Sequence, residues 1–280
     1  MIFKGVHSKP SILLNLFESL NLILNDITLF LTKDGLSSSC MDSSHVCLAE
    51  FSIEKEDFSE FNLKDNKSTN IGLHIASFVS ILKIAKNAKN IELIIKNNDK
   101  LDIVINTQYD SKKFRINLIN IDSDEQFEMT DHDYPCSIEM SPNIYNDIIS
   151  GCFVVESEAI KFNIKDNKLK ISSNGNIGDF EHTFNGQEFI EKKKLILKKK
   201  SGDTQKITHP KTNSYKIYDC TGNFNLEFSL KYFKLFSKAN LLSNSVTINL
   251  IEENPIRLDY EIENNGSLLS YYLAPKISDD

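Results

Sequence analysis

Residues 27–51 read ITLFLTKDGLSSSCMDSSHVCLAEF, and this stretch carries the clearest β-signal of the chain. Side chains from Ile27 to Thr32 alternate between two faces, which is the period of a strand. Residues 33–35, Lys-Asp-Gly, have the composition of a tight turn, so we expect a second strand run that ends at Phe51. The stretch therefore predicts a β-hairpin.

Working outward from this hairpin, the sequence predicts one order of elements that occurs twice. A helix is expected at 11–24, where apolar residues recur at spacings of three and four. Because the second half repeats the order of helices and strands, we expect two copies of one α+β unit. The other expected elements are a helix at 74–87, strands at 91–96, 101–106 and 113–120, a helix at 141–150, a hairpin of 158–164 and 168–173, a helix at 228–240, and strands at 246–251 and 256–262.

Two segments differ in charge from the rest of the chain. Residues 121–134 contain acidic residues and no Lys or Arg, which favours an extended, solvated connector. Residues 190–216 carry nine lysines against two acidic residues, a local net charge of +7. We therefore expect an N-terminal domain at 1–120, an acidic interdomain connector at 121–134, and a C-terminal domain at 135–280 with a Lys-rich insert at 190–216.

Composition excludes several classes of protein. The 280 residues have a net charge of −7, which excludes a uniformly basic nucleic-acid binder. Five cysteines without a C-x-x-C pair favour reduced thiols in a core over a zinc site. Neither a signal peptide nor an 18-residue apolar run is present, so we expect a soluble protein that is not secreted and has no membrane partner.

Residues with catalytic potential occur at Asp42, Ser44 and His45, which are the residue types of a serine hydrolase. On a strand, however, Ser44 and His45 would point to opposite faces and could not share a proton. The glycines of 174–178 lack a nucleotide-binding fingerprint, and the six histidines form no H-x-x-x-H pair. We expect no catalytic site, no metal and no cofactor, and keep the hydrolase as a distant alternative.

Lysines form a stripe on one helix of each half. Lys231, Lys234 and Lys238 would lie on one face of the helix at 228–240, opposite an apolar face. Lys83 and Lys86 lie similarly on the helix at 74–87. A solvated face is the ordinary explanation of such a stripe, but its recurrence in both halves favours contact with phosphate.

Three collinear stretches, printed at the end of this paragraph, resemble the sliding clamps of the proliferating-cell-nuclear-antigen (PCNA) family. The resemblance spans nearly the whole chain, including its two-unit organisation and the connector. The host it suggests is a large DNA virus or a eukaryote with an AT-rich genome. The stretches are Asp34-Gly-Leu-Ser-Ser-Ser-Cys-Met-Asp-Ser-Ser-His-Val-Cys-Leu48, Leu230-Lys-Tyr-Phe-Lys-Leu-Phe-Ser-Lys-Ala-Asn-Leu-Leu-Ser-Asn-Ser-Val246 and Tyr271-Tyr-Leu-Ala-Pro-Lys-Ile277.

The resemblance implies a two-domain DNA clamp fold and a homotrimeric ring, with helices lining a channel and sheets outside. Such a clamp encircles duplex DNA without reading its sequence, acts as a processivity factor for DNA polymerase, and docks other replication and repair proteins. It is not an enzyme. Strand 113–120 of one subunit is expected to pair with region 179–184 of the next. The residues expected to contact DNA are Lys83, Lys86, Lys231, Lys234 and Lys238.

The family also implies partners that insert a short apolar and aromatic plug, the PCNA-interacting peptide, beneath the connector, together with a clamp loader that opens the ring. Its members imply work in the nucleus, or at a cytoplasmic replication site for a viral clamp. The expected lining of the peptide pocket is Met41, His45, Val46, Leu48, Phe127, Met129, Tyr134, Pro255, Tyr272, Ala274 and Pro275.

Some positions depart from the family pattern. The first helix of each half offers only Lys9 as a basic residue, so the channel should be less positive than usual. Lys165 falls at a lysine that relatives use for ubiquitin attachment. The poor first helices and the Lys-rich insert leave one alternative open, a monomeric or dimeric clamp-fold subunit that binds DNA by a basic face.

Overall fold

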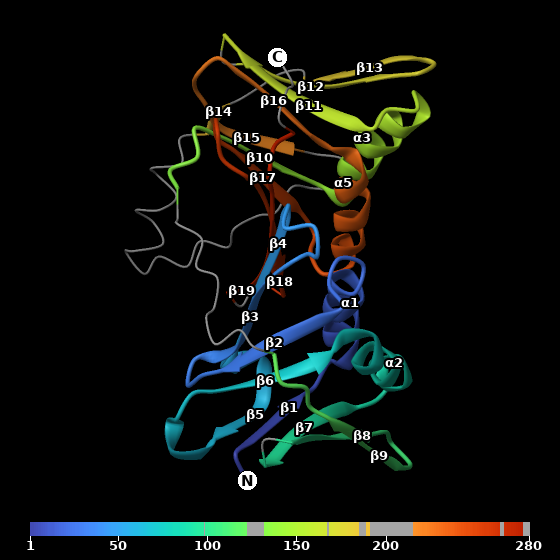
Figure 1. Ribbon diagram of the computed structural model, residues 1–280, viewed down its shortest axis with the longest axis vertical. Helices are drawn as coiled ribbons and strands as arrows, with labels where there is room; N and C mark the ends of the chain where they lie inside the picture. The colour runs from blue at the N-terminus through green and yellow to red at the C-terminus, as the bar shows by residue number, and fades with distance from the viewer. Residues whose placement is uncertain are drawn as a thin grey trace. The chain divides into compact units, whose positions relative to one another are not determined.

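The chain divides into two compact units in the computed structural model, and each unit is described by itself (Figure 1). Unit 1 consists of Met1–Met129 and Glu261–Ser270, and unit 2 of Thr130–Tyr260 and Tyr271–Asp280. The described residues are 1–97, 99–121, 132–166, 168–184, 189–190, 215–263 and 266–276.

Unit 1 contains two antiparallel groups of strands. One is a five-stranded sheet in the order β5-β1-β7-β8-β9, and the other has the order β4-β3-β2-β6. The strands are β1 (Phe3–His7), β2 (Asp26–Leu31), β3 (Gly35–Met41), β4 (Cys47–Glu54), β5 (Phe58–Leu63), β6 (Thr69–His74), β7 (Asn90–Asn97), β8 (Lys100–Asn106) and β9 (Ser111–Asn117).

The hairpin expected from residues 27–51 is present, with one correction. β2 pairs with β3 across residues 32–34, and a Cβ atom on Gly35 would lie 2.1 Å from the carbonyl oxygen of Ile53. Glycine therefore allows β3 to start close to β4. The strand run expected up to Phe51 is instead two strands, β3 and β4, because the chain turns at residues 42–46.

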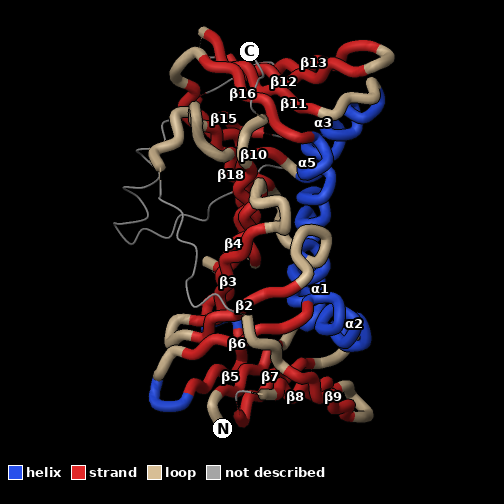
Figure 2. Tube along the Cα trace, in the orientation of Figure 1, coloured by secondary structure: helices blue, strands red, loops and turns tan. Residues whose placement is uncertain are grey.

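Two helices, α1 (Pro10–Leu20) and α2 (Ile75–Ala85), lie side by side along one flank of unit 1 (Figure 2). Short 3-10 turns occur at η1 (Lys55–Asp57) and η2 (Lys64–Asn66). The Phe17 ring of α1 lies 4.8 Å from that of Phe78 on α2 and 5.8 Å from that of Phe51 on β4. These edge-to-face contacts join the helices to the sheet core.

Unit 2 repeats this plan. A four-stranded sheet has the order β13-β12-β11-β16, and a second group has the order β14-β15-β10-β17-β18. β18 continues into unit 1, and β19 returns from unit 1 to unit 2. The strands are β10 (Cys136–Met140), β11 (Ala159–Lys165), β12 (Lys168–Gly175), β13 (Gly178–Thr183), β14 (Phe189–Ile190), β15 (Tyr215–Cys220), β16 (Phe224–Ser229), β17 (Val246–Leu250), β18 (Ile256–Ile262) and β19 (Ser267–Leu273).

The helices of unit 2 are α3 (Pro142–Val154) and α5 (Leu230–Phe236), and α5 continues into the 3-10 turn η3 (Ser237–Leu241). The prediction of one α-helix over 228–240 is therefore wrong at both ends. Phe228 belongs to β16, where it pairs with Ile160 of β11 and is fully buried. Strand pairing thus overrides the helical spacing of the apolar residues. Across the described residues, no helix has the length and hydropathy to cross a lipid bilayer.

Strand pairing confirms the predicted internal repeat. In unit 1, β1 pairs with β5 and β7, while β2 pairs with β3 and β6. In unit 2, β10 pairs with β15 and β17, while β11 pairs with β12 and β16. The pairs β3–β4 and β7–β8 likewise match β12–β13 and β17–β18. The two halves therefore share one topology.

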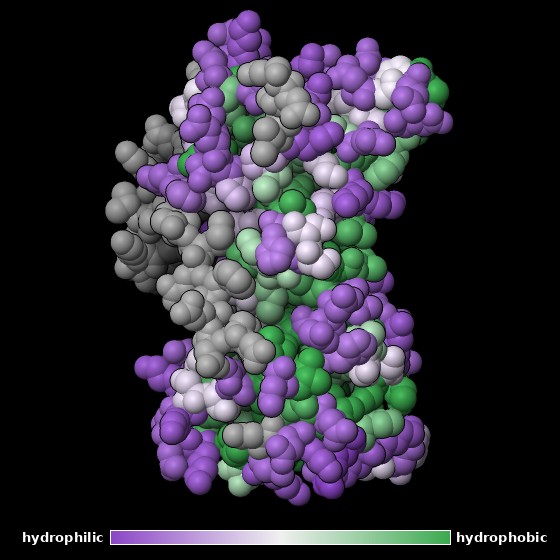
Figure 3. Space-filling model, in the orientation of Figure 1, coloured by the Kyte–Doolittle hydropathy of each residue, from purple (hydrophilic) through white to green (hydrophobic). Residues whose placement is uncertain are grey.

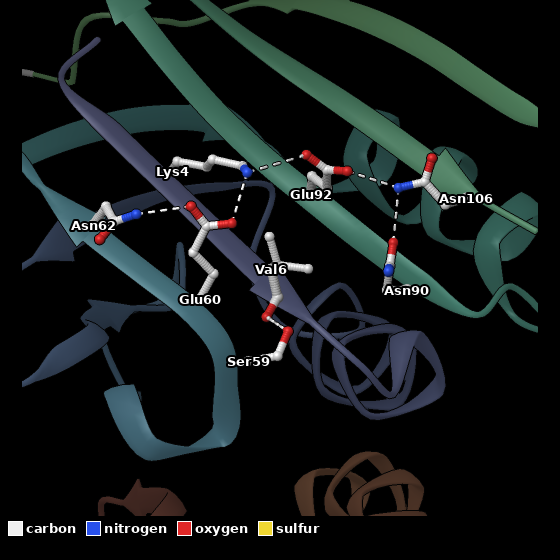
Figure 4. Close-up of polar contacts among 8 residues, drawn as sticks. All are labelled: Lys4, Val6, Ser59, Glu60, Asn62, Asn90, Glu92 and Asn106. Carbon is white, nitrogen blue, oxygen red and sulfur yellow. Dashed lines mark hydrogen bonds and ion pairs between the residues drawn. The ribbon is translucent and has the colours of Figure 1, made fainter.

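One face of the five-stranded sheet in unit 1 carries a polar network (Figure 4). Lys4 lies between two carboxylates, with its Nζ 2.6 Å from Glu60 and 3.8 Å from Glu92. Asn106 donates through Nδ2 to Glu92 at 2.7 Å and to Asn90 at 2.8 Å. Because β5, β1, β7 and β8 all contribute, cross-strand polar pairs join the strands on the face opposite the core.

Candidate functional site

β9 is the edge strand of the five-stranded sheet in unit 1, and its two faces differ. Phe114 and Ile116 lie opposite buried core residues of β8 and are half-buried. Lys113 and Arg115 point to the other face and are exposed. Hydrophilic residues predominate on the visible surface around β8 and β9 (Figure 3). The edge is therefore cationic on one face and apolar at Phe114 and Ile116 on the core side, where exposed Lys112 pairs with Asp110 at the start of the strand.

Asp102 of β8 anchors the cations of this edge. Its carboxylate lies 2.5 Å from Nε and 3.1 Å from Nη2 of Arg115, and 3.1 Å from Nζ of Lys113. Only 4% of the Asp102 side chain is exposed, whereas half of the Arg115 side chain is. Hydrogen bonding to Arg115 holds the pKa of Asp102 well below its usual range. Lys96 of β7 also lies near, with its Nζ 3.8 Å from Asp102, so one buried carboxylate pairs with three exposed cations.

β13 is the edge strand of the four-stranded sheet in unit 2, and its charge is opposite. Phe180 and His182 lie on the core side, half-buried, while Asp179 and Glu181 are exposed on the other face. A Cβ atom on Gly151 would come within 2.3 Å of the Phe180 ring, so only glycine lets this ring lie against α3. The edge is apolar on its core side and anionic on the other.

The inner strand β12 supports the acidic residues of this edge. Lys170 Nζ lies 2.6 Å from Glu181, and Asn174 Nδ2 donates to Asp179 at 2.8 Å. The hydrogen bond from Lys170 lowers the pKa of Glu181. Glu181 is more than half exposed, so this pair orients the carboxylate but adds little stability.

The predicted DNA-contacting lysines of unit 1 lie at the C-terminal end of α2. Lys83 belongs to the last turn of the helix, and Lys86 follows directly after it. Both are exposed, while Phe78 and Leu82 on the opposite side are buried. Lys83 Nζ lies 3.6 Å from Oε1 of Glu18 on α1. Part of the charge of Lys83 is therefore compensated locally.

In unit 2, the predicted lysines are distributed over two kinds of helix. Lys231 and Lys234 are exposed on α5, whereas Lys238 is half-buried in the 3-10 turn η3. Lys231 Nζ lies 5.0 Å from the ring centroid of Tyr232. Because a 3-10 turn has three residues per turn, Lys238 does not continue the α-helical stripe that the sequence predicted.

The first helix of each unit carries no Lys or Arg within its bounds. α1 instead has the half-exposed Glu18, and α3 has the exposed Asp147. Neither helix offers a basic side chain within its bounds, and a channel less positive than usual stays a prediction.

The three residues of the hydrolase alternative lie in the turn at 42–46, so the argument that they alternate along a strand is wrong. A different contact opposes catalysis. Asp42 Oδ1 accepts hydrogen bonds from the backbone N–H groups of Val46 and Cys47, each at 2.9 Å. Asp42 is 6% exposed, and His45 adopts a positive φ of 56° in the same turn. The carboxylate therefore organises the turn, as Asp residues commonly do.

The predicted peptide-pocket residues of unit 1 flank this turn. Met41 is 37% exposed and Val46 is 38% exposed, which is high for large apolar side chains, and His45 is exposed as well. Leu48 is only 3% exposed and lies in the core. A partner could therefore contact Met41, His45 and Val46 directly. Leu48 is buried in the core and is not accessible to a partner. Phe127 and Met129 fall outside the described residues.

In unit 2, one aromatic member of the predicted pocket contacts an arginine that sequence reasoning missed. Arg257 Cζ lies 5.6 Å from the ring centroid of Tyr272, and its Nε donates to Asp259 at 2.7 Å. Burial alone would lower the pKa of Arg257, but the Asp259 carboxylate more than offsets this. The net shift of the pKa is upward, so the guanidinium stays charged. The other expected members here are Tyr134 and Tyr272, both buried, and Pro255, Ala274 and Pro275, all half-buried.

Comparisons with known proteins agree with this architecture. The family model for the N-terminal domain of proliferating cell nuclear antigen matches residues 2–127, and the model for its C-terminal domain matches residues 128–276. The chain belongs to the PCNA family. Its relatives include the proliferating cell nuclear antigens of Chaetomium thermophilum, 27% identical over 97% of both chains, and of Caenorhabditis elegans, 28% identical over 100% of this chain and 98% of the other.

The fold is also that of a solved PCNA structure. The crystal structure of proliferating cellular nuclear antigen from Entamoeba histolytica matches 98% of this chain with a TM-score of 0.80 at 20% sequence identity, and 99% of that chain is covered. The predicted two-domain clamp fold is therefore confirmed.

As a member of the PCNA family, the chain is a DNA sliding clamp and a processivity factor for DNA polymerase. Sliding clamps of this family are not enzymes. In the part of the chain that the structure describes, His, Cys, Asp and Glu side chains form no group that could hold a metal ion. Lys165 ends β11 and is exposed, and most of the Lys-rich insert at 190–216 lies outside the described residues.

Proposed function

We propose that this clamp is a closed ring of three identical subunits, joined head to tail by pairing of β9 with β13 of the next subunit. The internal repeat carries this proposal. By order and pairing, β9 and β13 correspond to β19 and β4 in the other half of the chain.

β19 and β4 are already hydrogen-bonded neighbours in the strand order. In unit 1, where the first residues of β19 lie, Ser267 Oγ accepts a hydrogen bond from the Glu54 backbone N–H at 2.9 Å. Within unit 1, β4 thus already pairs with a strand of the kind that β13 would meet between chains. Such a head-to-tail interface closes into a ring when the rotation allows, and it covers the β9 and β13 edges of every subunit.

The two edges are complementary in side chains as well as in backbone. The apolar core sides would bring Phe114 and Ile116 toward Phe180 and His182, while Lys113 and Arg115 would face Asp179 and Glu181. Opposite charges favour this register and oppose pairing of two copies of the same edge.

Within such a ring, the lysines of α2, α5 and η3 would contact duplex DNA through its phosphates. Sliding requires contacts that carry no sequence information, and a few lysines on helices supply these without base readout. The absence of Lys and Arg from α1 and α3 suits a loose hold on DNA. The net charge of −7 would keep DNA from the rest of the surface.

A second proposed surface takes the apolar and aromatic plug of partner proteins, including DNA polymerase. Exposed Met41 and Val46 in unit 1 support it, as do the aromatic residues around Arg257 in unit 2. We also propose residues 121–134 as the connector between domains at 1–120 and 135–280. A clamp loader would open the ring, and the eukaryotic relatives favour work in the nucleus.

The mass of the protein in solution tests the ring. Light scattering should give three times the chain mass of 31.9 kDa at micromolar concentration. A stable monomer would contradict the ring and favour the alternative of a clamp-fold subunit that holds DNA by a basic face. The lysine-poor first helices are the observation that favours this alternative.

A further inference from the structure

Two cysteines of unit 2 lie directly opposite each other on neighbouring strands. Cys136 begins β10, Cys220 ends β15, and the two residues are register partners in the antiparallel pair. Their Sγ atoms are 3.4 Å apart, with the thiol of Cys136 donating to the sulfur of Cys220. All five cysteines of the chain are free thiols.

The backbone geometry at this pair suits a disulfide. Directly opposite residues of an antiparallel pair have Cα atoms about 4.5–5.5 Å apart, within the range of about 4.4–6.8 Å that disulfides span. A register irregularity follows Cys136, which leaves local freedom where the strand begins. The two sulfurs therefore need to approach by little more than a rotamer adjustment.

The chemistry of Cys220 favours attack by its sulfur. The hydrogen bond from Cys136 lowers the pKa of the Cys220 thiol, although burial opposes this. The thiols of Cys47 and Cys152 differ from that of Cys220, because burial raises the pKa of both. Both sulfurs of the pair lie at strand ends, and exposed residues Thr221 and Gly222 follow Cys220 directly. Fraying of this end would admit a small oxidant.

We propose that Cys136 and Cys220 are a redox modification site, at which a low-molecular-weight disulfide such as oxidised glutathione forms a reversible intramolecular disulfide. The Cys220 thiolate attacks one glutathione sulfur, the glutathione disulfide breaks, and one glutathione thiolate leaves. The Cys136 thiolate then attacks Cys220 Sγ and displaces the second glutathione. Two cysteine thiols lose two electrons and two protons, and one glutathione disulfide becomes two glutathione thiols.

The bond would fix the point where the chain enters unit 2. Cys136 follows Tyr134 and Pro135, and the carbonyl oxygen of Pro135 already accepts a hydrogen bond from the backbone N–H of Thr221 at 3.1 Å. The cross-link spans a sequence separation of 84 residues. Closing so long a loop restricts the unfolded chain, so oxidation should raise the Tm of the protein by about 5–10 °C.

Peptide mapping of the full chain tests the proposal. The protein is incubated with oxidised glutathione, free thiols are alkylated, and the digest is analysed by mass spectrometry without reduction. The expected result is one cross-linked peptide pair joining Cys136 to Cys220, with loss of two hydrogens from the chain. Dithiothreitol should reverse both the cross-link and the rise in Tm.

Two variants complete the experiment. Cys220→Ser should abolish the cross-link and the Tm shift, while Cys152→Ser, which removes another buried thiol, should retain both. Full alkylation of Cys136 and Cys220 after oxidation of the wild-type protein would overturn the proposal, whatever the variants do. A glutathione adduct at the half-buried Cys40 with no Cys136–Cys220 cross-link would overturn it equally.

Discussion

The two edge strands β9 and β13 are built alike and charged oppositely. Each has half-buried apolar or aromatic residues on its core side and two charged residues on the other face that contact the neighbouring inner strand. In unit 1 a buried acid, Asp102, holds exposed cations. In unit 2 a half-buried base, Lys170, holds an exposed acid, Glu181.

The difference shows how one repeated unit can be made to join only head to tail. Two copies of β9 would place cations opposite cations, and two copies of β13 would place anions opposite anions. Like charges directly opposite each other on paired strands are destabilising. Only pairing of β9 with β13 would satisfy both faces of the proposed joint, so the charges favour head-to-tail assembly over symmetric pairs of chains.

Reversing the charge of β13 should have the largest effect. In the double variant Asp179→Lys with Glu181→Lys, cations of one chain would face Lys113 and Arg115 of the next. We expect the dissociation constant for assembly to rise roughly 100-fold or more, because like-charge contacts cost several kcal/mol. Sedimentation at a series of protein concentrations measures this constant.

A matched control separates the edge from net charge. Glu158→Lys with Glu252→Lys makes the same change in charge at exposed positions of unit 2 outside β13. This control should assemble as the wild type does. Equal weakening in both double variants would mean that β13 is not at the joint and that the comparison of the two edges has no bearing on assembly.

The second expected effect concerns the anchors beneath the edges. Asp102→Asn leaves Arg115 and Lys113 without their buried partner, and we expect the free energy of unfolding to fall by roughly 1–3 kcal/mol. For chains diluted until they are monomeric, Glu181→Gln on the other edge removes only an exposed ion pair and should cause no measurable loss. Urea unfolding at matched protein concentration measures both, and equal losses would contradict the contrast between a buried and an exposed anchor.

The pH dependence of this loss follows from the lowered pKa of Asp102. Since its folded pKa lies below the unfolded value of about 4, its stabilisation is present above that pH and is lost as the pH falls through the folded pKa. The difference in stability between wild type and Asp102→Asn should therefore stay constant from about pH 7 to about pH 5 and shrink only in stronger acid. A difference that shrinks between pH 7 and pH 5 would assign the effect to another group.

Local patterns in the sequence were sufficient for elements whose neighbours lie close in the chain. The alternation of 27–32 and the turn at 33–35 predicted β2 and the start of β3, and the strands at 246–251 and 256–262 are β17 and β18 within one residue. The repeat was also predictable, because its elements recur in order. Hairpins and amphipathic helices are specified by residues that are near in sequence.

Features that depend on distant partners could not be predicted in this way. The helical spacing at Phe228 gave no sign that Ile160, far away in sequence, would pair with it in a strand. The turn at 42–46 depends on one carboxylate that accepts two backbone N–H groups. Arg257 and Asp259 are two residues apart on β18 and so share one face, a signal that could have identified their ion pair. The contact of Arg257 with Tyr272 could not be predicted, because it forms only in the folded sheet.

The third prediction compares the lysines of the two units. Replacing Lys231, Lys234 and Lys238 by Ala should reduce the salt dependence of DNA binding more than replacing Lys83 and Lys86. Each lost phosphate contact lowers the slope of log K against log salt by about 0.9, and Lys83 is already partly compensated by Glu18. Binding to circular duplex DNA over a range of salt concentrations measures the slopes, and both variants should remain trimeric. An unchanged slope in both variants would mean that these helices do not face DNA.

The smallest expected effect concerns the compensation of the Lys83 charge by Glu18. Glu18→Gln removes the carboxylate 3.6 Å from Lys83 Nζ, so the lysine charge becomes fully available to phosphate. We expect tighter DNA binding at low salt and a salt slope that is steeper by less than about 0.9, since at most one contact is strengthened.

Asp147→Asn is the matched control, because it removes one negative charge from the corresponding helix of unit 2. No lysine contact of Asp147 occurs among the ion pairs of the described residues. If local pairing governs the effect, Glu18→Gln should increase DNA affinity more than Asp147→Asn does. Adding Lys83→Ala should then remove the gain in affinity from Glu18→Gln but not the gain from Asp147→Asn. Equal gains in affinity that persist with Lys83→Ala would instead show that DNA binding depends only on the summed charge of the first helices. Compensation by Glu18 would then not distinguish the α2 lysines from the α5 lysines.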